Sequence, residues 1–155
     1  LLFAGADYSV KTIKGDELAD LIEEDARDAS LILGKFLDVK EKFPGDSNLH
    51  LAIRLKEINS LILLMQTDDI NAMNNDGLTP LHLSIHNEYS WATQKLLQLK
   101  VDVNTIDNKG ESPLWTACID KKNKVLSRTL INLDANMDIT IDNHSLNHHL
   151  QKLFM

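Results

Sequence analysis

Three histidines near the end of the chain are the side chains whose type and spacing come closest to a chemical site. His144 and His148 lie four residues apart, so a helix would place both imidazoles on one face, and His149 follows directly. Imidazole is a common zinc ligand, but zinc takes three or four ligands, and no acidic residue follows at the spacing of a metalloprotease helix. We therefore expect no metal site.

The sequence lacks the other local signatures of catalysis. It has no glycine-rich phosphate loop, no nucleophile elbow and no pair of cysteines at metal-ligand spacing. We therefore expect a protein that is not an enzyme and that needs no cofactor.

The cellular compartment can be inferred from cysteine usage and from hydropathy. Cys118 is the one cysteine, so it can form no internal disulfide, which suits a reducing compartment. No apolar run approaches the roughly 20 residues of a membrane span, and no signal-peptide pattern is present. We expect an intracellular protein without membrane insertion, in the cytoplasm or the nucleus.

The net charge of −7 is concentrated in one stretch. Residues 16–28 hold seven acidic side chains against Arg27 alone. Such a surface repels phosphate backbones, so nucleic-acid binding is disfavoured. The stretch is either a solvated helix face or a docking site for a basic segment of a protein partner. The acidic residues are Asp16, Glu17, Asp20, Glu23, Glu24, Asp25 and Asp28.

The pattern that organises the chain is an internal repeat. Residues 77–82 read Gly-Leu-Thr-Pro-Leu-His, and residues 110–115 read Gly-Glu-Ser-Pro-Leu-Trp. A hydroxyl residue before proline is typical of a helix start, because the hydroxyl accepts a bond from a free amide and proline stands where no donor is needed. Each unit therefore opens with a turn that leads into a helix.

A second marker, an acidic or amide residue followed by an apolar one, recurs at a similar period. The distance along the sequence between successive copies of this marker is close to the distance between the two glycine-containing strings, and the last of these distances is the longest. Because this marker uses other residue types in another part of the unit, it supports the repeat independently. The copies are Asp7-Tyr8, Asp38-Val39, Asp69-Ile70, Asp102-Val103 and Asn136-Met137.

The period and the string Thr79-Pro80-Leu81-His82 resemble the ankyrin repeat, a β-turn followed by two antiparallel helices. The resemblance implies an all-α repeat solenoid forming a single domain over residues 1–155, in which each unit buries its apolar face against its neighbours. We expect a piece of a longer array. Its units are a partial repeat at 1–14, repeats at 15–44, 45–76, 77–109 and 110–143, and a partial repeat at 144–155.

Apolar spacing predicts which side chains face the core. In the second helix of unit 45–76 we expect Ile58, Leu61, Ile62, Leu64 and Met65 on one apolar face. In unit 110–143 the corresponding apolar positions include Val125, Leu130 and Ile131.

The resemblance also assigns framework roles. His50 and His82 occupy the position at which the family's imidazole connects the capping hydroxyl to the neighbouring turn. Trp115 stands at the same position but can only donate a hydrogen bond, so we expect a buried space filler, with a partner-facing aromatic as the alternative. Lys100 and Asp134 replace the usual cap glycine, and each is expected to strain a left-handed position by on the order of 1 kcal/mol.

Ankyrin arrays generally bind proteins through their turn tips and the concave side of their first helices. Met73, Leu78 and Ile106 are the informative positions, because apolar residues on turns in register would form one exposed row. The turn tips carried over are Lys40, Glu41, Lys42, Met73, Asn74, Asn75, Ile106, Asn108 and Lys109. The first-helix positions are Asp46, Arg54, Leu55, Leu78, His86, Asn87, Glu111, Ile119 and Asp120.

Two further features are candidates for function. Tyr89 and Trp91 precede or begin a second helix, where an aromatic either anchors a partner or packs on a neighbouring loop. Asn71 and Asn104 lie in a context that resembles ankyrin asparagines hydroxylated in animal cells, and the alternative is that each amide stiffens its own turn.

The resemblance implies a non-enzymatic scaffold or adaptor that binds a protein partner. Two other hypotheses stay open: a substrate-recruiting or regulatory part of a larger enzyme or ubiquitin-ligase complex, and a structural spacer. The partner-binding residues we select are Met73, Asn75, Leu78, His86, Asn87, Ile106, Asn108, Glu111, Ile119 and Trp91.

Overall fold

The computed structural model of the chain describes residues 34, 35 and 37–155. The chain divides into two compact units, Leu1–Leu37 and Asp38–Met155, and the helices and strands named below belong to the second. The expected partial repeat at 1–14, the acidic stretch 16–28 and most of repeat 15–44 lie outside the described residues.

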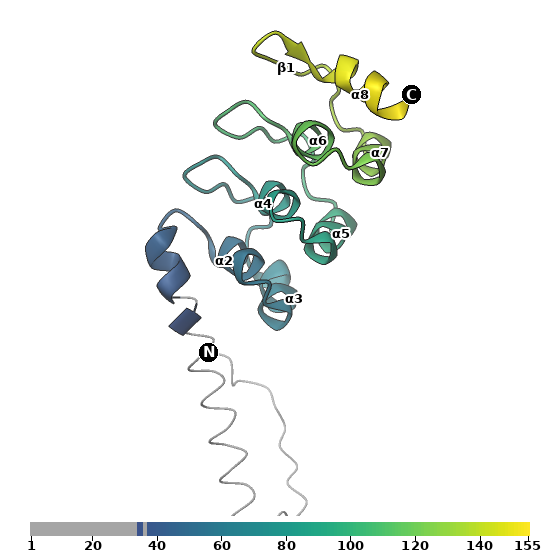
Figure 1. The fold of residues 1–155 in the computed structure, drawn as a ribbon. Helices are drawn as coiled ribbons and strands as arrows, with labels where there is room; N and C mark the ends of the chain where they lie inside the picture. Colours follow the sequence, from purple (N-terminus) through teal and green to yellow (C-terminus); the bar gives the residue numbers. More distant parts are fainter. Residues whose placement is uncertain (1–33, 36) are drawn as a thin grey trace, which may run out of the picture. The chain divides into compact units, whose positions relative to one another are not determined.

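The second unit is built from pairs of antiparallel helices that stack in chain order (Figure 1). In Figure 1 the first helices α2, α4 and α6 form one row and the second helices α3, α5 and α7 form another, and α2 contacts α4 as α4 contacts α6. This arrangement confirms the predicted repeat solenoid. The pairs are α2 (Asn48–Leu55) with α3 (Ile58–Thr67), α4 (Pro80–His86) with α5 (Ser90–Gln98), and α6 (Pro113–Trp115), which continues as η1 (Thr116–Asp120), with α7 (Lys124–Asn132).

A hairpin and a last helix complete the second unit. Strands β1 (Thr140–Ile141) and β2 (His144–Ser145) pair antiparallel and lead into α8 (Leu146–Phe154). The two turn residues between the strands have positive φ, 48° at Asp142 and 63° at Asn143, as a two-residue hairpin turn of type I′ requires. His144 is therefore in a strand, and the prediction that it shares a helix face with His148 is wrong.

The helix starts follow the predicted capping chemistry. The Thr79 side chain accepts a bond from the His82 amide at the start of α4, and Pro80 takes the first helical position. Ser112 caps the Trp115 amide at the start of α6 in the same way, with an N–O distance of 3.1 Å. The hydroxyl and proline together explain why each of these first helices starts where it does.

The first helices supply most of the core. The prediction that Ile58, Ile62 and Val125 also face the core is wrong, because 46 %, 48 % and 78 % of their surfaces are exposed. They lie on second helices, which have a neighbour on fewer sides than the first helices have. The buried residues of the first helices include Leu49, Leu51, Ile53, Leu81, Leu83, Ile85 and Leu114, each at most 2 % exposed.

The chain reverses at residues with a left-handed backbone. Lys100 has φ 57° and Asp134 has φ 60°, which confirms that both occupy the position where the family usually has glycine. Lys56, Glu88 and Lys122 adopt the same conformation between the two helices of their pairs. Every described helix pair thus has a residue other than glycine in the strained left-handed conformation.

The first helix of the last full repeat is one residue longer than its counterpart in the repeat before it. The left-handed Glu88 follows the cap residue Thr79 by nine positions, whereas Lys122 follows Ser112 by ten. The extra residue is absorbed in η1, where the Lys121 amide bonds to the carbonyl of Thr116, five residues back, at 3.0 Å.

One predicted turn is a helix instead. Lys40, Glu41 and Lys42 were expected at a turn tip, but they are helical, and the Phe43 amide bonds to the Val39 carbonyl at 2.9 Å. Asp38-Val39 therefore does not end a repeat as Asp69-Ile70 does.

Over residues 34, 35 and 37–155, every helix is too short or too polar to cross a membrane.

Candidate protein-binding surface

Two turns with the same internal bonding form the tips of the array. The Asn74 side-chain oxygen accepts bonds from the amides of Asp76 and Leu78, both at 3.0 Å. Asp107, at the equivalent place in the next turn, accepts bonds from the amides of Lys109 and Glu111, both at 2.9 Å. A side chain that satisfies the backbone of its own turn holds that turn in one shape.

The two turns are also bonded to each other. The Asn108 amide nitrogen donates to the Asp76 carbonyl at 3.0 Å, and the Asn108 side chain donates to the Asn75 carbonyl at 2.8 Å. Met73 and Ile106, one position before the bonded side chain of each turn, are 54 % and 55 % exposed. The turns therefore present two large apolar side chains at equivalent places.

Two expected surface residues are buried, and their assignment is corrected. Asn74 is 9 % exposed and Asp46 is 7 % exposed, and the Asn74 side chain donates to Asp46 at 2.7 Å. Asp46 also pairs with Arg54, whose guanidinium lies 3.6 Å from the centre of the Phe43 ring. The Asp46 carboxylate is buried and therefore needs polar partners, which Asn74 and Arg54 supply. The bond from Asn74 also joins two consecutive turns.

The rings of His50 and His82 each bridge a helix start and the next turn, and we call each of these bridges a histidine strut. The bridges confirm the predicted framework role. Nε2 of His50 donates to the Leu78 carbonyl at 2.8 Å, and Nε2 of His82 donates to the Glu111 carbonyl at 3.2 Å. Nδ1 of each ring accepts from the capping hydroxyl, at 2.7 Å from Ser47 and 2.9 Å from Thr79. Burial lowers the pKa of both imidazoles below 6.5, which favours the neutral form that this pattern requires.

Trp115 does not reproduce the strut. The residue is 6 % exposed, as a space filler should be, and its backbone amide donates to the Ser112 hydroxyl of its own helix start. The prediction of a buried tryptophan is confirmed at this position.

The first-helix positions lie beside the turns and are partly covered. His86, Asn87, Glu111 and Ile119 are each half-buried, as is Leu78 at the end of its turn. Burial lowers the pKa of His86, and burial followed by the nearby Asp120 raises the pKa of Glu111.

The asparagines considered for modification connect consecutive repeats. The Asn71 side-chain oxygen accepts from the Asp102 amide at 3.0 Å. The Asn104 side chain accepts from the Asn136 amide at 2.7 Å and donates to the Asp134 carbonyl at 3.2 Å. Both residues are exposed, and their hydroxylation stays a prediction.

Tyr89 and Trp91 lie at the start of α5, away from the turns. Their rings stack with centres 6.1 Å apart, and the Tyr89 hydroxyl donates to the Lys56 carbonyl at 3.4 Å. The pair therefore packs toward the loop of the preceding repeat, as one of the two expectations for these residues stated.

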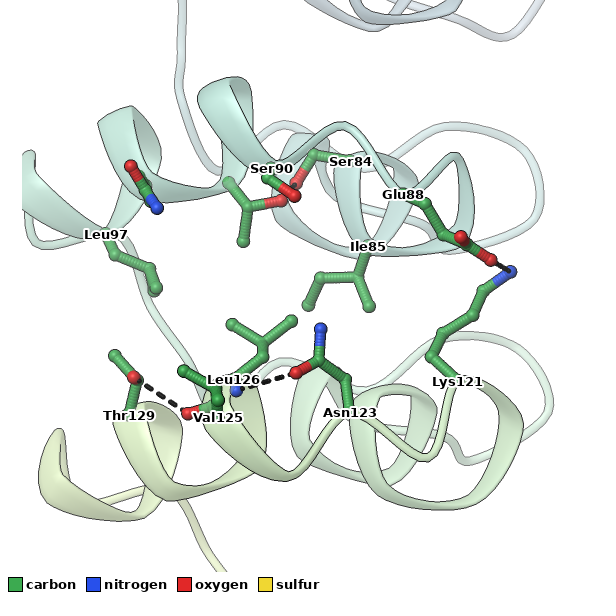
Figure 2. A pocket seen from close by; sticks show the side chains of 12 residues that line it. Ser84, Ile85, Glu88, Ser90, Leu97, Lys121, Asn123, Val125, Leu126 and Thr129 are labelled. Atoms are coloured by element: carbon green, nitrogen blue, oxygen red, sulfur yellow. Dashed lines mark hydrogen bonds and ion pairs between the residues drawn. The ribbon is translucent and has the colours of Figure 1, made fainter.

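Sequence reasoning missed a groove that α4 and α5 form with α7 (Figure 2). Its volume is about 330 Å³, and an ion pair between Glu88 and Lys121, with atoms 3.3 Å apart, borders it. Ile85 and Leu126 point into it from opposite helices in Figure 2. No sequence signal marks this groove, because its walls come from different repeats.

Comparisons with known proteins agree with this architecture. A family model described as ankyrin repeats, in three copies, matches residues 23–107. An ankyrin repeat protein of Fowlpox virus (strain NVSL) is 38 % identical over 81 residues, which is 51 % of this chain and 24 % of the viral protein. The tyrosine-protein kinase HTK16 of Hydra vulgaris is 33 % identical over 81 residues, which is 50 % of this chain and 11 % of the kinase.

A solved structure resembles the fold over a longer part of the chain. The crystal structure of the ankyrin repeat domain of Bcl-3, described as a unique member of the IkappaB protein family, superposes with a TM-score of 0.62 and 25 % sequence identity. The match covers 72 % of this chain and 53 % of that one. The chain thus spans about a quarter or less of the two relatives and about half of the solved domain.

Proposed function

Because this chain belongs to the ankyrin repeat family, we propose that it is a non-enzymatic scaffold or adaptor that binds a protein partner through its turn tips and the adjoining faces of its first helices. The observation that carries the proposal is the pair of exposed apolar side chains, Met73 and Ile106, on turns that are bonded to each other. An intracellular setting, in the cytoplasm or the nucleus, is part of the proposal.

The rigidity of the turns supports this function. Each turn is fixed by its own Asn74 or Asp107 side chain and by the bonds from Asn108 to the preceding turn. A surface that is ordered before binding loses less conformational entropy when the partner arrives. Two apolar contacts with a polar surround can then give useful affinity.

The surround is polar, as in the outer part of a protein interface. Asn75 and Asn108 lie next to the apolar tips, and both are exposed. His86, Asn87, Glu111 and Ile119 extend the surface along the first helices, whereas Trp91 would form a separate contact on α5.

A pair of charged substitutions tests the proposal. After a pull-down has identified a partner, its affinity for purified Met73→Asp and Ile106→Asp chains is measured by calorimetry. Each change should weaken binding at least tenfold, about 1.4 kcal/mol, without lowering the melting temperature, because both side chains are exposed. Leu78 is left unchanged, because it is half-buried and its carbonyl holds His50.

Val125→Asp is the matched control. Val125 is apolar and 78 % exposed, but it lies on α7, away from the turns. Affinity that falls equally in the control would show a nonspecific effect of charge. Full affinity in both turn variants would remove the proposed surface.

A second function is favoured by one comparison. The Hydra vulgaris relative is a tyrosine-protein kinase, of which this chain covers only 11 %. The repeats here would then recruit substrates or regulate a larger enzyme or ubiquitin-ligase complex. The sequence of the parent protein separates the two: a catalytic, zinc-binding or F-box-like segment favours this function, and further repeats alone favour the adaptor. A spacer would instead yield no partner in affinity purification.

A further inference from the structure

Three potential metal ligands meet beside the second turn. His86 comes from the last turn of α4, whereas Asp107 and Glu111 come from the turn that precedes α6. One ligand atom of each side chain lies within 4.8 Å of the corresponding atom of the other two. An imidazole and two carboxylates are thus brought together from separate parts of the repeat array.

Glu111 contributes an oxygen atom that lacks a partner. Within residues 34, 35 and 37–155, its Oε2 is buried and makes no hydrogen bond. A buried carboxylate oxygen without a partner is costly, and a cation is one group that would satisfy it. The observation is independent of the spacing of the cluster.

Asp107 is held in place by the turn itself. The residue is 7 % exposed, and its Oδ1 accepts bonds from the amides of Lys109 and Glu111. The carboxylate is therefore positioned before any ligand arrives, and these hydrogen bonds orient it as similar bonds orient the ligands of known metal sites.

The three side chains offer the atoms that metal binding needs. An imidazole nitrogen has a lone pair when the ring is neutral, and each carboxylate offers an oxygen.

We propose that His86, Asp107 and Glu111 bind a divalent transition-metal ion of the zinc class. A set with one imidazole nitrogen and two carboxylate oxygens suits zinc, whereas calcium and magnesium take oxygen ligands. Ligands of a tetrahedral zinc ion lie about 3.4 Å apart, so the ligand atoms, which lie within 4.8 Å of one another, must close by up to about 1.4 Å. Three protein ligands leave a fourth position for water or for a group of a partner.

Calorimetric titration of the purified chain with zinc chloride at pH 7.4 tests this site. The unmodified chain should bind one zinc ion, and His86→Ala and Glu111→Gln should each lower the affinity at least tenfold. Unfolding of each variant without zinc shows whether its fold is kept. Absence of zinc binding to the unmodified chain, or equal zinc affinity in the unmodified chain and in both variants, would overturn the proposal.

His149→Ala is the control, because histidines near the end of the chain could hold zinc on their own. The His149 ring lies 6.0 Å from the rings of both His144 and His148, so this change removes the member that both pairs share. Zinc affinity should be unchanged in the control, and its loss there would assign the zinc to those histidines. A zinc-induced shift of the His86 ring signals in NMR spectra reads the site directly in the unmodified chain, and unmoved signals would refute it.

Discussion

Repeats 77–109 and 110–143 begin their first helices with the same capping hydroxyl and proline, but they contact the following repeat differently. In the first, His82 connects its helix start to the Glu111 carbonyl of the next turn. In the second, Trp115 fills the same position and is buried, and within residues 34, 35 and 37–155 its indole makes no hydrogen bond to the turn that follows. The comparison shows that a shared helix start does not determine how consecutive repeats are joined.

The turns that follow the two repeats differ in the same sense. The turn after α5 is held in shape by Asp107 and is tied to its neighbours through Asn108 and the His82 ring. The turn after α7 closes on itself as the β1–β2 hairpin, and the Leu146 amide bonds to the Ile139 carbonyl at 2.9 Å. At the position of the histidine, the first joint is therefore hydrogen-bonded and the second is packed, although Asn104 bonds to Asp134 and Asn136 beyond α7.

The largest expected effect comes from placing phenylalanine at both positions. His82→Phe removes both ring bonds from a fully buried site, and we expect it to lower the free energy of unfolding by about 2 kcal/mol. Trp115→Phe breaks no polar bridge but leaves part of the indole volume empty, so its cost should be that of a small cavity, about 1 kcal/mol. Urea denaturation followed by circular dichroism measures both. Equal losses of unfolding free energy in the two variants would mean that His82 and Trp115 join their repeats in the same way.

The contrast between the joints also explains what the sequence could predict. The period and the Thr79-Pro80 start predicted the helix pairs, and the hydroxyl predicted the caps, because these depend on neighbouring residues. The spacing from Asp102 to Asn136 is longer than that from Asp69 to Asp102, which agrees with an extra residue in the last repeat. Its location in η1 could not be predicted, because any part of the unit could have absorbed it.

The candidate surface was predictable to a similar extent. The exposure of Met73 and Ile106 follows from their places in the turns. The burial of Asn74 against Asp46 does not, since the two residues come from different turns and a polar turn residue is normally solvated. The approach of His86 to Asp107 depends in the same way on the stacking of one repeat on the next.

A smaller effect is expected from the pH dependence of stability. Burial holds the folded-state pKa of His82 below the unfolded value of about 6.5. Below pH 6.5 the unfolded chain thus binds more protons, so the stability that is present above 6.5 is lost as the pH falls toward the folded-state pKa. His82→Phe should flatten this slope by at most about 1.4 kcal/mol per pH unit, and Trp115→Phe should leave it unchanged.

Denaturation curves at pH 7.5, 6.5 and 5.5 provide the measurement. His50 and His86 also have lowered pKa values, so the total slope in the unmodified chain contains their contributions. The difference between the unmodified chain and His82→Phe isolates the strut. An unchanged slope in His82→Phe would contradict a neutral, buried imidazole at the first joint.

The smallest effect concerns a feature that the two repeats share. Lys100 ends the first repeat at φ 57° and Asp134 ends the second at φ 60°. Glycine accepts this conformation without steric cost but loses more entropy on folding, so Lys100→Gly and Asp134→Gly should each stabilise the chain by about 0.5–1 kcal/mol. Thermal unfolding measures the gain, and Lys100→Ala, which removes the charge but keeps Cβ, should show none. The Asp134→Gly variant keeps the backbone carbonyl that accepts a hydrogen bond from Asn104. Equal gains in stability in the two variants would therefore locate the strain in the left-handed residue alone. A gain confined to Lys100→Gly would show that the packing around Asp134 compensates for the strain at that position.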